Sequence, residues 1–284
     1  MCGVAGIIAP FASPAWRKAT LSELLKQAES RGNDATGIAF TDPKAGLTVV
    51  KNGVDADTFV ESEEYEKITH SLPAIVMGHT RQATGGTQAI ASNNENNHPF
   101  YSMESGIAVI HNGVVNDTPW RKTVGMDGGI KHPFKGGTDS EVFLRVVESM
   151  VEDEKDPSME SAIYDACYNI SGTYALAFLR QAEPDKIWFA CHGNPITLGY
   201  NEKERYIVWA STEKIIEDAM ADYKWMLNFF WKKIEAKLTI NQLKDNHMLT
   251  IKINDKEPYF ELSTRELKVH PNSTYSSAGR RHGK

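Results

Sequence analysis

The chain has 284 residues, of which 41% are hydrophobic and 24% charged, with a formal net charge of −6. This composition is typical of a globular protein with a sizeable core. The excess of acidic residues argues against a protein built to coat nucleic acid. No run of eighteen apolar residues occurs, and the apolar N-terminal run is too short for a signal peptide, so we expect no membrane association and a cytoplasmic location.

The three cysteines, Cys2, Cys167 and Cys191, have no paired spacing. They therefore predict neither a disulfide framework nor a zinc site, and no metal or cofactor is expected. Cys167 lies in a predicted helix and Cys191 at a predicted strand end, where both are expected to be packed core thiols.

Cys2 differs because it becomes the first residue once Met1 is removed, as expected before a small residue. An α-amino group has a pKa near 7.7, against about 10.4 for lysine, so it can act as a general base near neutral pH. The adjoining thiol is a strong nucleophile that needs only such a base. The alternative is that Cys2 is a small apolar residue that falls near the start by chance, and this stretch alone leaves both readings open.

The first half of the chain alternates strand and helix patterns. A buried strand ends at Ile8, and Ser13-Pro14 caps a helix that closes before Gly32. The remaining elements are a hairpin of strands at 38–41 and 47–51, a helix at 62–70, strands at 74–77 and 106–110, and a long loop over 116–137. We expect the last of these strands to end at His111-Asn112-Gly113.

In the second half, Thr138 and Glu141 have the spacing of a capping box that opens an amphipathic helix. Further patterns predict helices at 158–168 and from 213 to about 220, and strands at 173–179, 187–190, 196–198, 206–209, 248–253 and 259–262. This order indicates an α+β protein of one domain, with antiparallel sheets layered with helices.

Several motifs then stand in a fixed order: Cys2 to Ile7, Arg31 to Gly37, Gly78 to Arg81, His111 to Gly113, Thr138-Asp139 and Gly172 to Ala175. Together they resemble the class II glutamine amidotransferases, which are N-terminal-nucleophile hydrolases. The resemblance implies a four-layer αββα sandwich of antiparallel sheets. It places a glutaminase domain over residues 2–265, followed by a tail at 266–284 that we expect to be disordered.

The resemblance also implies a role for each matching residue. Cys2 would attack the glutamine amide, and Asn112 and Gly113 would form the oxyanion hole. The substrate would be held by Arg81, Thr84 and Asp139, with Arg31, Asp34 and His98 in support.

Each of these assignments has a structural alternative. Asn112-Gly113 is also a common hairpin turn. Arg81 could form a surface salt bridge. Asp139 could simply favour a helix N-terminus. His98 could organise its loop rather than contact substrate, and we favour that structural reading.

Two positions depart from the aminosugar-synthase branch of the family, in which Gln82 is usually Trp and Gly85 usually His. No synthase domain follows in the sequence, so we expect glutamine to be hydrolysed to glutamate and ammonia for a synthase acting in trans. The alternatives are hydrolysis of another γ-glutamyl amide without transfer, or an inactive regulatory module. An aromatic stretch at 225–231 is either core or a docking face for that partner, and an oligomer is compatible with either reading.

Overall fold

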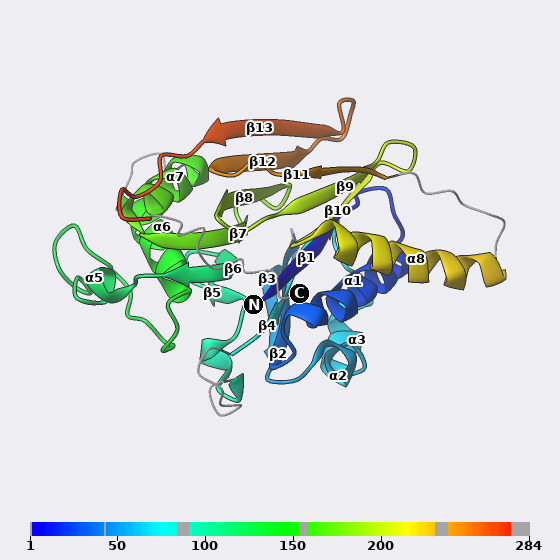
Figure 1. The fold of residues 1–284 in the computed structure, drawn as a ribbon, viewed down its shortest axis with the longest axis horizontal. Helices are drawn as coiled ribbons and strands as arrows, with labels where there is room; N and C mark the ends of the chain where they lie inside the picture. The colour runs from blue at the N-terminus through cyan, green and yellow to red at the C-terminus, as the bar shows by residue number, and fades with distance from the viewer. Residues whose placement is uncertain (1, 43, 84–90, 154–157, 231–237, 274–284) are drawn as a thin grey trace, which may run out of the picture.

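The computed structural model describes residues 2–42, 44–83, 91–153, 158–230 and 238–273, with only the backbone described for 153 and 222–230. Two antiparallel sheets pack face to face, and helices cover the outer face of each (Figure 1). The predicted α+β class and αββα layering are therefore confirmed. No helix in the described ranges combines the length and apolar character needed to cross a membrane.

The first sheet has seven strands in the order β11-β9-β10-β1-β4-β2-β3. Their bounds are β1 (Gly3–Ile8), β2 (Ala35–Asp42), β3 (Gly46–Asn52), β4 (Ile75–Arg81), β9 (Thr197–Asn201), β10 (Tyr206–Ala210) and β11 (Thr239–Gln242). β1 is central and buried along its whole length, as its small and apolar residues predict. It pairs with β4 on one side and with β10, some 200 residues later in the chain, on the other.

The second sheet has six strands in the order β13-β12-β8-β7-β6-β5. Their bounds are β5 (Phe100–Ser102), β6 (Ile107–Val115), β7 (Gly172–Arg180), β8 (Lys186–His192), β12 (His247–Ile253) and β13 (Phe260–Glu266). β6 packs across the sandwich against β1 and β4, which brings the middle of the chain next to its beginning.

Helices α1 (Pro14–Ala28), α2 (Ala56–Val60), α3 (Glu63–Thr69) and α8 (Glu213–Phe230) lie outside the seven-stranded sheet. The six-stranded sheet is covered by α6 (Glu141–Asp153) and α7 (Met159–Asn169), with α5 (Thr118–Arg121) at one end. Two short 3₁₀ helices, η1 (Glu29–Arg31) and η2 (Asn94–Asn96), lie in connecting segments. The side chain of Ser13 caps α1 as predicted, and Ser62 and Ser158 do the same for α3 and α7.

The apolar residues form three cores, one in each interval between layers. One lies between α1, α8 and the first sheet, and a second between α6, α7 and the other sheet. The third lies between the two sheets and contains Val4, Ala175 and Trp209. Cys167 and Cys191 are buried in these cores, which confirms their prediction as packed thiols.

Three expectations about local structure are wrong. β6 does not end at Asn112-Gly113 but runs through this pair to Val115, so the pair does not form a hairpin turn. Thr138 and Glu141 form no capping box: Thr138 Oγ1 lacks a partner among the described residues, and the Glu141 carboxylate accepts from the backbone N–H groups of Lys135 and Gly136. α8 continues ten residues beyond the expected end, to Phe230.

The chain also continues as folded structure beyond residue 265. β13 reaches Glu266, and Leu267 is packed into the core under α6 and α7. Ser273 accepts a hydrogen bond from the Gly172 N–H. The rest of the expected tail, 274–284, lies outside the described residues, as do the side chains of the aromatic stretch at 225–231.

Candidate active site

Cys2 directly precedes the central strand β1 and is half-buried. The β1–β4 pairing sets Gly3 opposite Thr80, so Cys2 and Arg81 follow at the same end of the sheet. The Cys2 thiol lies 3.8 Å from the Gln82 carbonyl oxygen. Burial raises the pKa of this thiol, and the nearby positive charge of Arg81 opposes that shift. The thiol is therefore held in its protonated form and needs a base to become a nucleophile.

Two side chains fix the backbone at the start of β1. Arg31 donates from Nε to the Cys2 carbonyl oxygen at 2.9 Å. Ser211 is fully buried, and its Oγ accepts from the Val4 N–H at 2.9 Å. The Ser211 N–H in turn donates to the Val4 carbonyl oxygen. Cys2 thus leads a strand that is pinned from both sides.

Arg81 ends β4 and is only 4% exposed, so the alternative of a surface salt bridge is wrong. Its Nη1 donates to Asn97 Oδ1 at 2.8 Å. Asn97 is itself fully buried and donates to the Ala91 carbonyl oxygen. A neutral amide thus orients the guanidinium, and no carboxylate among the described residues forms an ion pair with it. This leaves the charge of Arg81 available for an anion.

Asp34 supports the segment after β4 rather than β1 itself. Its carboxylate accepts from the Gln82 side chain at 2.9 Å and from the Ala83 N–H at 2.7 Å. Gln82, which replaces the tryptophan common in one branch of the resembling family, therefore anchors this segment beside the Cys2 thiol. Thr84 and Gly85 lie outside the described residues.

Asn112 and Gly113 lie within β6, opposite Ala175 and Tyr174 of β7. The Asn112 side chain is 3% exposed, and its Nδ2 has no hydrogen-bond partner among the described residues. A Cβ atom on Gly113 would lie 2.0 Å from the Thr173 carbonyl oxygen, so only glycine fits. A buried donor without a partner costs about 1–3 kcal/mol, which suggests that it serves a ligand.

Asp139 lies before the first residue of α6, where its Oδ2 accepts from the Val115 N–H at 2.8 Å. Its negative charge acts on Cys2, Arg81 and His111, which places each of these three groups within electrostatic range of the Asp139 carboxylate. The carboxylate therefore joins the end of β6 to the start of α6, instead of only favouring a helix N-terminus.

Three histidines form a buried group beneath these residues. His79 and His98 stack with ring centroids 3.8 Å apart, and His79 Nε2 lies 3.1 Å from the His111 carbonyl oxygen. Neither ring nitrogen of His98 has a hydrogen-bond partner among the described residues, and the ring instead stacks on His79 and meets the Phe100 ring edge-on. Burial lowers the pKa of His79 to about 3, and it lowers the pKa of His98 and His111 as well.

These lowered pKa values predict a loss of stability in acid. Below the unfolded pKa of about 6.5, the unfolded chain binds protons that the folded chain excludes, so the free energy of unfolding falls as pH drops towards 3. Each histidine contributes a slope of about 1.4 kcal/mol per pH unit in that window. Urea unfolding between pH 7 and 5 should show a smaller decline for His98→Leu than for the parent. The same decline in both proteins would contradict the prediction, and His70→Leu, at an exposed position, is the matched control.

Asn97 and Ser211 are site-supporting residues that the sequence analysis missed. Asn97 lies in a stretch so polar that it predicts only a loop, and Ser211 follows β10 with no motif around it. No local signal could have found either residue, because their partners Arg81 and Val4 lie far away in the chain.

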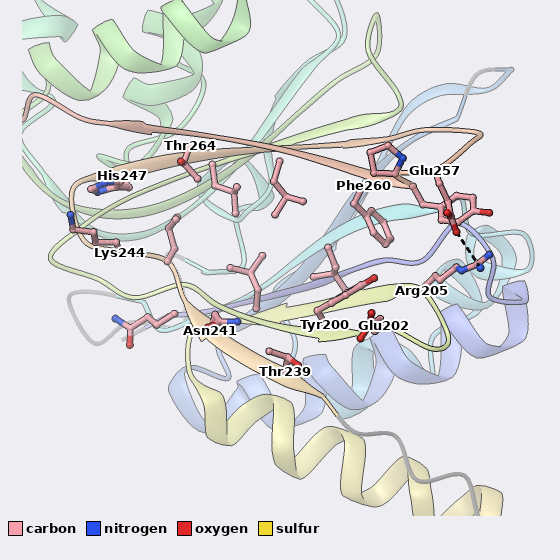
Figure 2. A pocket seen from close by; sticks show the side chains of 18 residues that line it. Tyr200, Glu202, Arg205, Thr239, Asn241, Lys244, His247, Glu257, Phe260 and Thr264 are labelled. Carbon is pink, nitrogen blue, oxygen red and sulfur yellow. Dashed lines mark ion pairs between the residues drawn. The ribbon is translucent and has the colours of Figure 1, made fainter.

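A large cavity elsewhere in the described part of the chain is a separate feature. It has a volume of about 1210 Å³ and opens between β9 and β11 on one side and β12 and β13 on the other (Figure 2). Its walls are largely apolar, and at its rim Arg205 lies 3.7 Å from Glu257 and over the Tyr259 ring. None of the predicted site residues lines it.

Proteins of known function with similar sequences are glutamine-dependent aminotransferases. The chain is 32% identical over 209 residues to glutamine–fructose-6-phosphate aminotransferase (isomerizing) of Sulfolobus acidocaldarius, and 31% identical over 210 residues to the Pseudomonas aeruginosa enzyme of that name. Both alignments cover 73% of this chain, but only 33% and 31% of the relatives. The chain thus spans about a third of the length of these relatives. No family model matches it.

Solved structures agree on the fold. Glutamine phosphoribosylpyrophosphate amidotransferase of Bacillus subtilis superposes with a TM-score of 0.63 at 19% identity, over 92% of this chain and 49% of that one. A glutamine aminotransferase class-II domain protein of Silicibacter pomeroyi superposes with a TM-score of 0.54 at 16% identity, over 94% and 99%.

Two facing antiparallel sheets between helical layers, with a cysteine directly before the central strand, form the sandwich fold of the N-terminal-nucleophile class. Within that class, the sequence relatives are glutamine-dependent aminotransferases. The chain belongs to the class II glutamine amidotransferases.

Proposed function

We propose that the protein hydrolyses the side-chain amide of glutamine through a γ-glutamyl thioester on Cys2. The observation that carries the proposal is the buried, unpartnered amide of Asn112 on β6, the strand that packs against the one led by Cys2. Acyl transfer from an amide requires a nucleophile and a hydrogen-bond donor for the oxyanion, and here the two lie on facing strands.

In the first step, the free α-amine of Cys2 takes the thiol proton while Sγ attacks the amide carbon. The oxygen of the tetrahedral intermediate then receives hydrogen bonds from Asn112 Nδ2 and the Gly113 N–H. The amine returns its proton to the departing nitrogen, which leaves as ammonia. Water, activated by the same amine, then splits the thioester and releases glutamate.

Substrate recognition needs one cation and one anion at fixed positions. We assign the α-carboxylate of glutamine to Arg81, whose guanidinium is oriented by Asn97 and can bind two oxygens at once. Thr84 is proposed as a second contact for that carboxylate. The α-ammonium is assigned to Asp139, whose carboxylate is held by the Val115 N–H.

Asp139→Asn should raise the glutamine KM by about 10-fold to 100-fold and leave kcat within a few-fold. Asparagine keeps the shape and an oxygen for Val115 but lacks the charge, and a charged hydrogen bond is worth about 1.5–3 kcal/mol. Steady-state kinetics of glutamate release measures both constants. Asp57→Asn, which removes only an ion pair with the Lys26 side chain near the surface, is the matched control. An unchanged KM in Asp139→Asn would exclude the ammonium contact.

The proposal is tested most directly by supplying glutamine to the purified protein and measuring glutamate and ammonia. The intact mass of the active protein must lack Met1, because an amide nitrogen at residue 2 cannot act as the base. A glutamine-like electrophile should modify Cys2 alone. Turnover of a different γ-glutamyl amide in preference to glutamine would replace the proposed substrate.

We further propose that the ammonia passes to a synthase acting in trans in the cytoplasm. The names of the sequence relatives support nitrogen transfer to an acceptor, since they pair glutamine with fructose-6-phosphate. A synthase that copurifies from native cells should form an aminated product from glutamine only when this protein is present. Free ammonia should support the same amination when this protein is left out. If the synthase formed the product from glutamine with neither this protein nor free ammonia present, the partnership would be excluded.

A further inference from the structure

A cluster of side chains of the types that bind metal ions lies on and beside α6, away from Cys2. Glu148 and Glu152 are one turn apart on this helix, and His132 approaches them from the segment that joins α5 to α6. The three donor atoms all lie within 4.8 Å of one another. At a rise of 1.5 Å per residue, Glu148 and Glu152 lie about 10 Å and about 16 Å along α6 from Glu141, its first residue. Asp139 lies before that residue, so the cluster is separate from the site proposed above.

Glu148 is the unusual member because it is completely buried. Its Oε2 accepts from Arg145 Nη1 at 2.9 Å, but its Oε1 has no hydrogen-bond partner among the described residues. Glu152 places a second carboxylate at i+4, where like charges repel. A buried carboxylate oxygen without a partner is costly, and a cation bound between the two acids would remove both penalties.

Each member of the cluster is also held from behind, as metal ligands commonly are. His132 Nδ1 faces the Glu104 carboxylate, outside the cluster, at 3.7 Å. Its Nε2 lies 2.9 Å from Glu152 Oε1, a contact inside the cluster that a bound ion would replace. Glu148 is oriented by Arg145, as described above. Glu152 lies 3.9 Å from Lys131 Nζ.

The local charges leave an excess of negative charge. Four carboxylates, those of Glu104, Glu141, Glu148 and Glu152, stand around two cations, those of Arg145 and Lys131. With neutral imidazole, two negative charges remain, which one divalent ion neutralises. Imidazole favours zinc and its neighbours over magnesium and calcium, which prefer oxygen donors alone.

We propose that His132, Glu148 and Glu152 bind a divalent transition-metal ion of the zinc class, with water completing a four-coordinate site. The ion fastens the segment before α6, which carries His132, to the helix. This departs from the expectation of no metal, which rested on cysteine spacing. That pattern could not report ligands made of one histidine and two glutamates.

The test uses the full chain carrying Cys2→Ala, so that this thiol cannot itself bind the ion. Co²⁺ is the spectroscopic probe and Zn²⁺ the competitor. We expect about one equivalent of Co²⁺ per chain, with visible absorption bands that disappear when Zn²⁺ is added. His132→Asn and Glu152→Gln should each weaken Co²⁺ binding at least about tenfold. His70→Asn, an exposed histidine elsewhere, should bind as the parent does.

Thermal unfolding supplies a second readout. Zn²⁺ at about a hundredfold excess over its Kd should raise the Tm of the parent by about 5 °C or more, and should leave the Tm of His132→Asn unchanged. No Co²⁺ uptake by the parent would overturn the proposal. Binding by His132→Asn and Glu152→Gln as tight as that of the parent would overturn it equally, because the ion would then lie elsewhere.

Discussion

Cys2→Ala should abolish glutamine hydrolysis, with a loss of at least about 10⁴-fold in kcat. The variant loses the only group that attacks the amide in the proposed mechanism. It should nevertheless fold normally, because the one hydrogen bond of the thiol within the described ranges is a long one, to the Gln82 carbonyl oxygen at 3.8 Å. Glutamate release measures the first effect, and thermal unfolding, with a Tm within about 2 °C of the parent, measures the second.

Cys191→Ala is the matched control for this experiment. It removes a buried thiol that lies 3.3 Å from the Lys244 carbonyl oxygen, so it should lower stability and retain turnover. The two cysteine variants therefore separate chemistry from packing. Glutamine turnover by Cys2→Ala at the parent rate would refute the assigned nucleophile.

Asn112→Ala should lower kcat by about 10²-fold to 10³-fold, while the glutamine KM changes only a few-fold. Removing one oxyanion donor costs about 2.7–4 kcal/mol of transition-state stabilisation, because the donor acts mainly when negative charge develops on the oxygen. Steady-state kinetics at saturating glutamine measures the effect. Stability should change little, since Nδ2 has no hydrogen bond to lose among the described residues.

Asn201→Ala is the matched control, and we expect it to affect stability rather than kcat. Asn201 is equally buried, but its amide donates to Tyr206 and its oxygen accepts from the Glu204 N–H. We expect this variant to lose stability and keep its kcat. If Asn112→Ala also lost only stability, the role of Asn112 would be structural and the oxyanion hole would have to be sought elsewhere.

Much of the fold could be predicted because its signals are local. The Ser13 cap and the spacing of Leu21, Leu24 and Leu25 predict α1, and the small apolar residues after Cys2 predict β1. The alternation of such patterns indicates the α+β class. The edge strands β5 and β11 were missed because they are only three and four residues long, which is too short for a clear period.

The site was harder to predict because long-range contacts override local preferences. Asn-Gly favours a turn, yet at 112–113 the pair continues a strand because it pairs with β7. Glycine is needed there because the Thr173 carbonyl leaves no space for a Cβ. Glu141 has capping-box spacing, but the buried Arg145 takes its carboxylate instead. Such choices depend on residues that the local sequence does not contain.

The pairing of β1 with β10 has a consequence for synthesis of the chain. The first strand cannot be enclosed until Tyr206–Ala210 and Ser211 have emerged, because they supply one of its two neighbours. At about 5–20 residues per second, the leading end then remains accessible for about 10–40 s on the ribosome. The removal of Met1 that the proposed mechanism requires would fall within that interval, before folding buries the surroundings of Cys2.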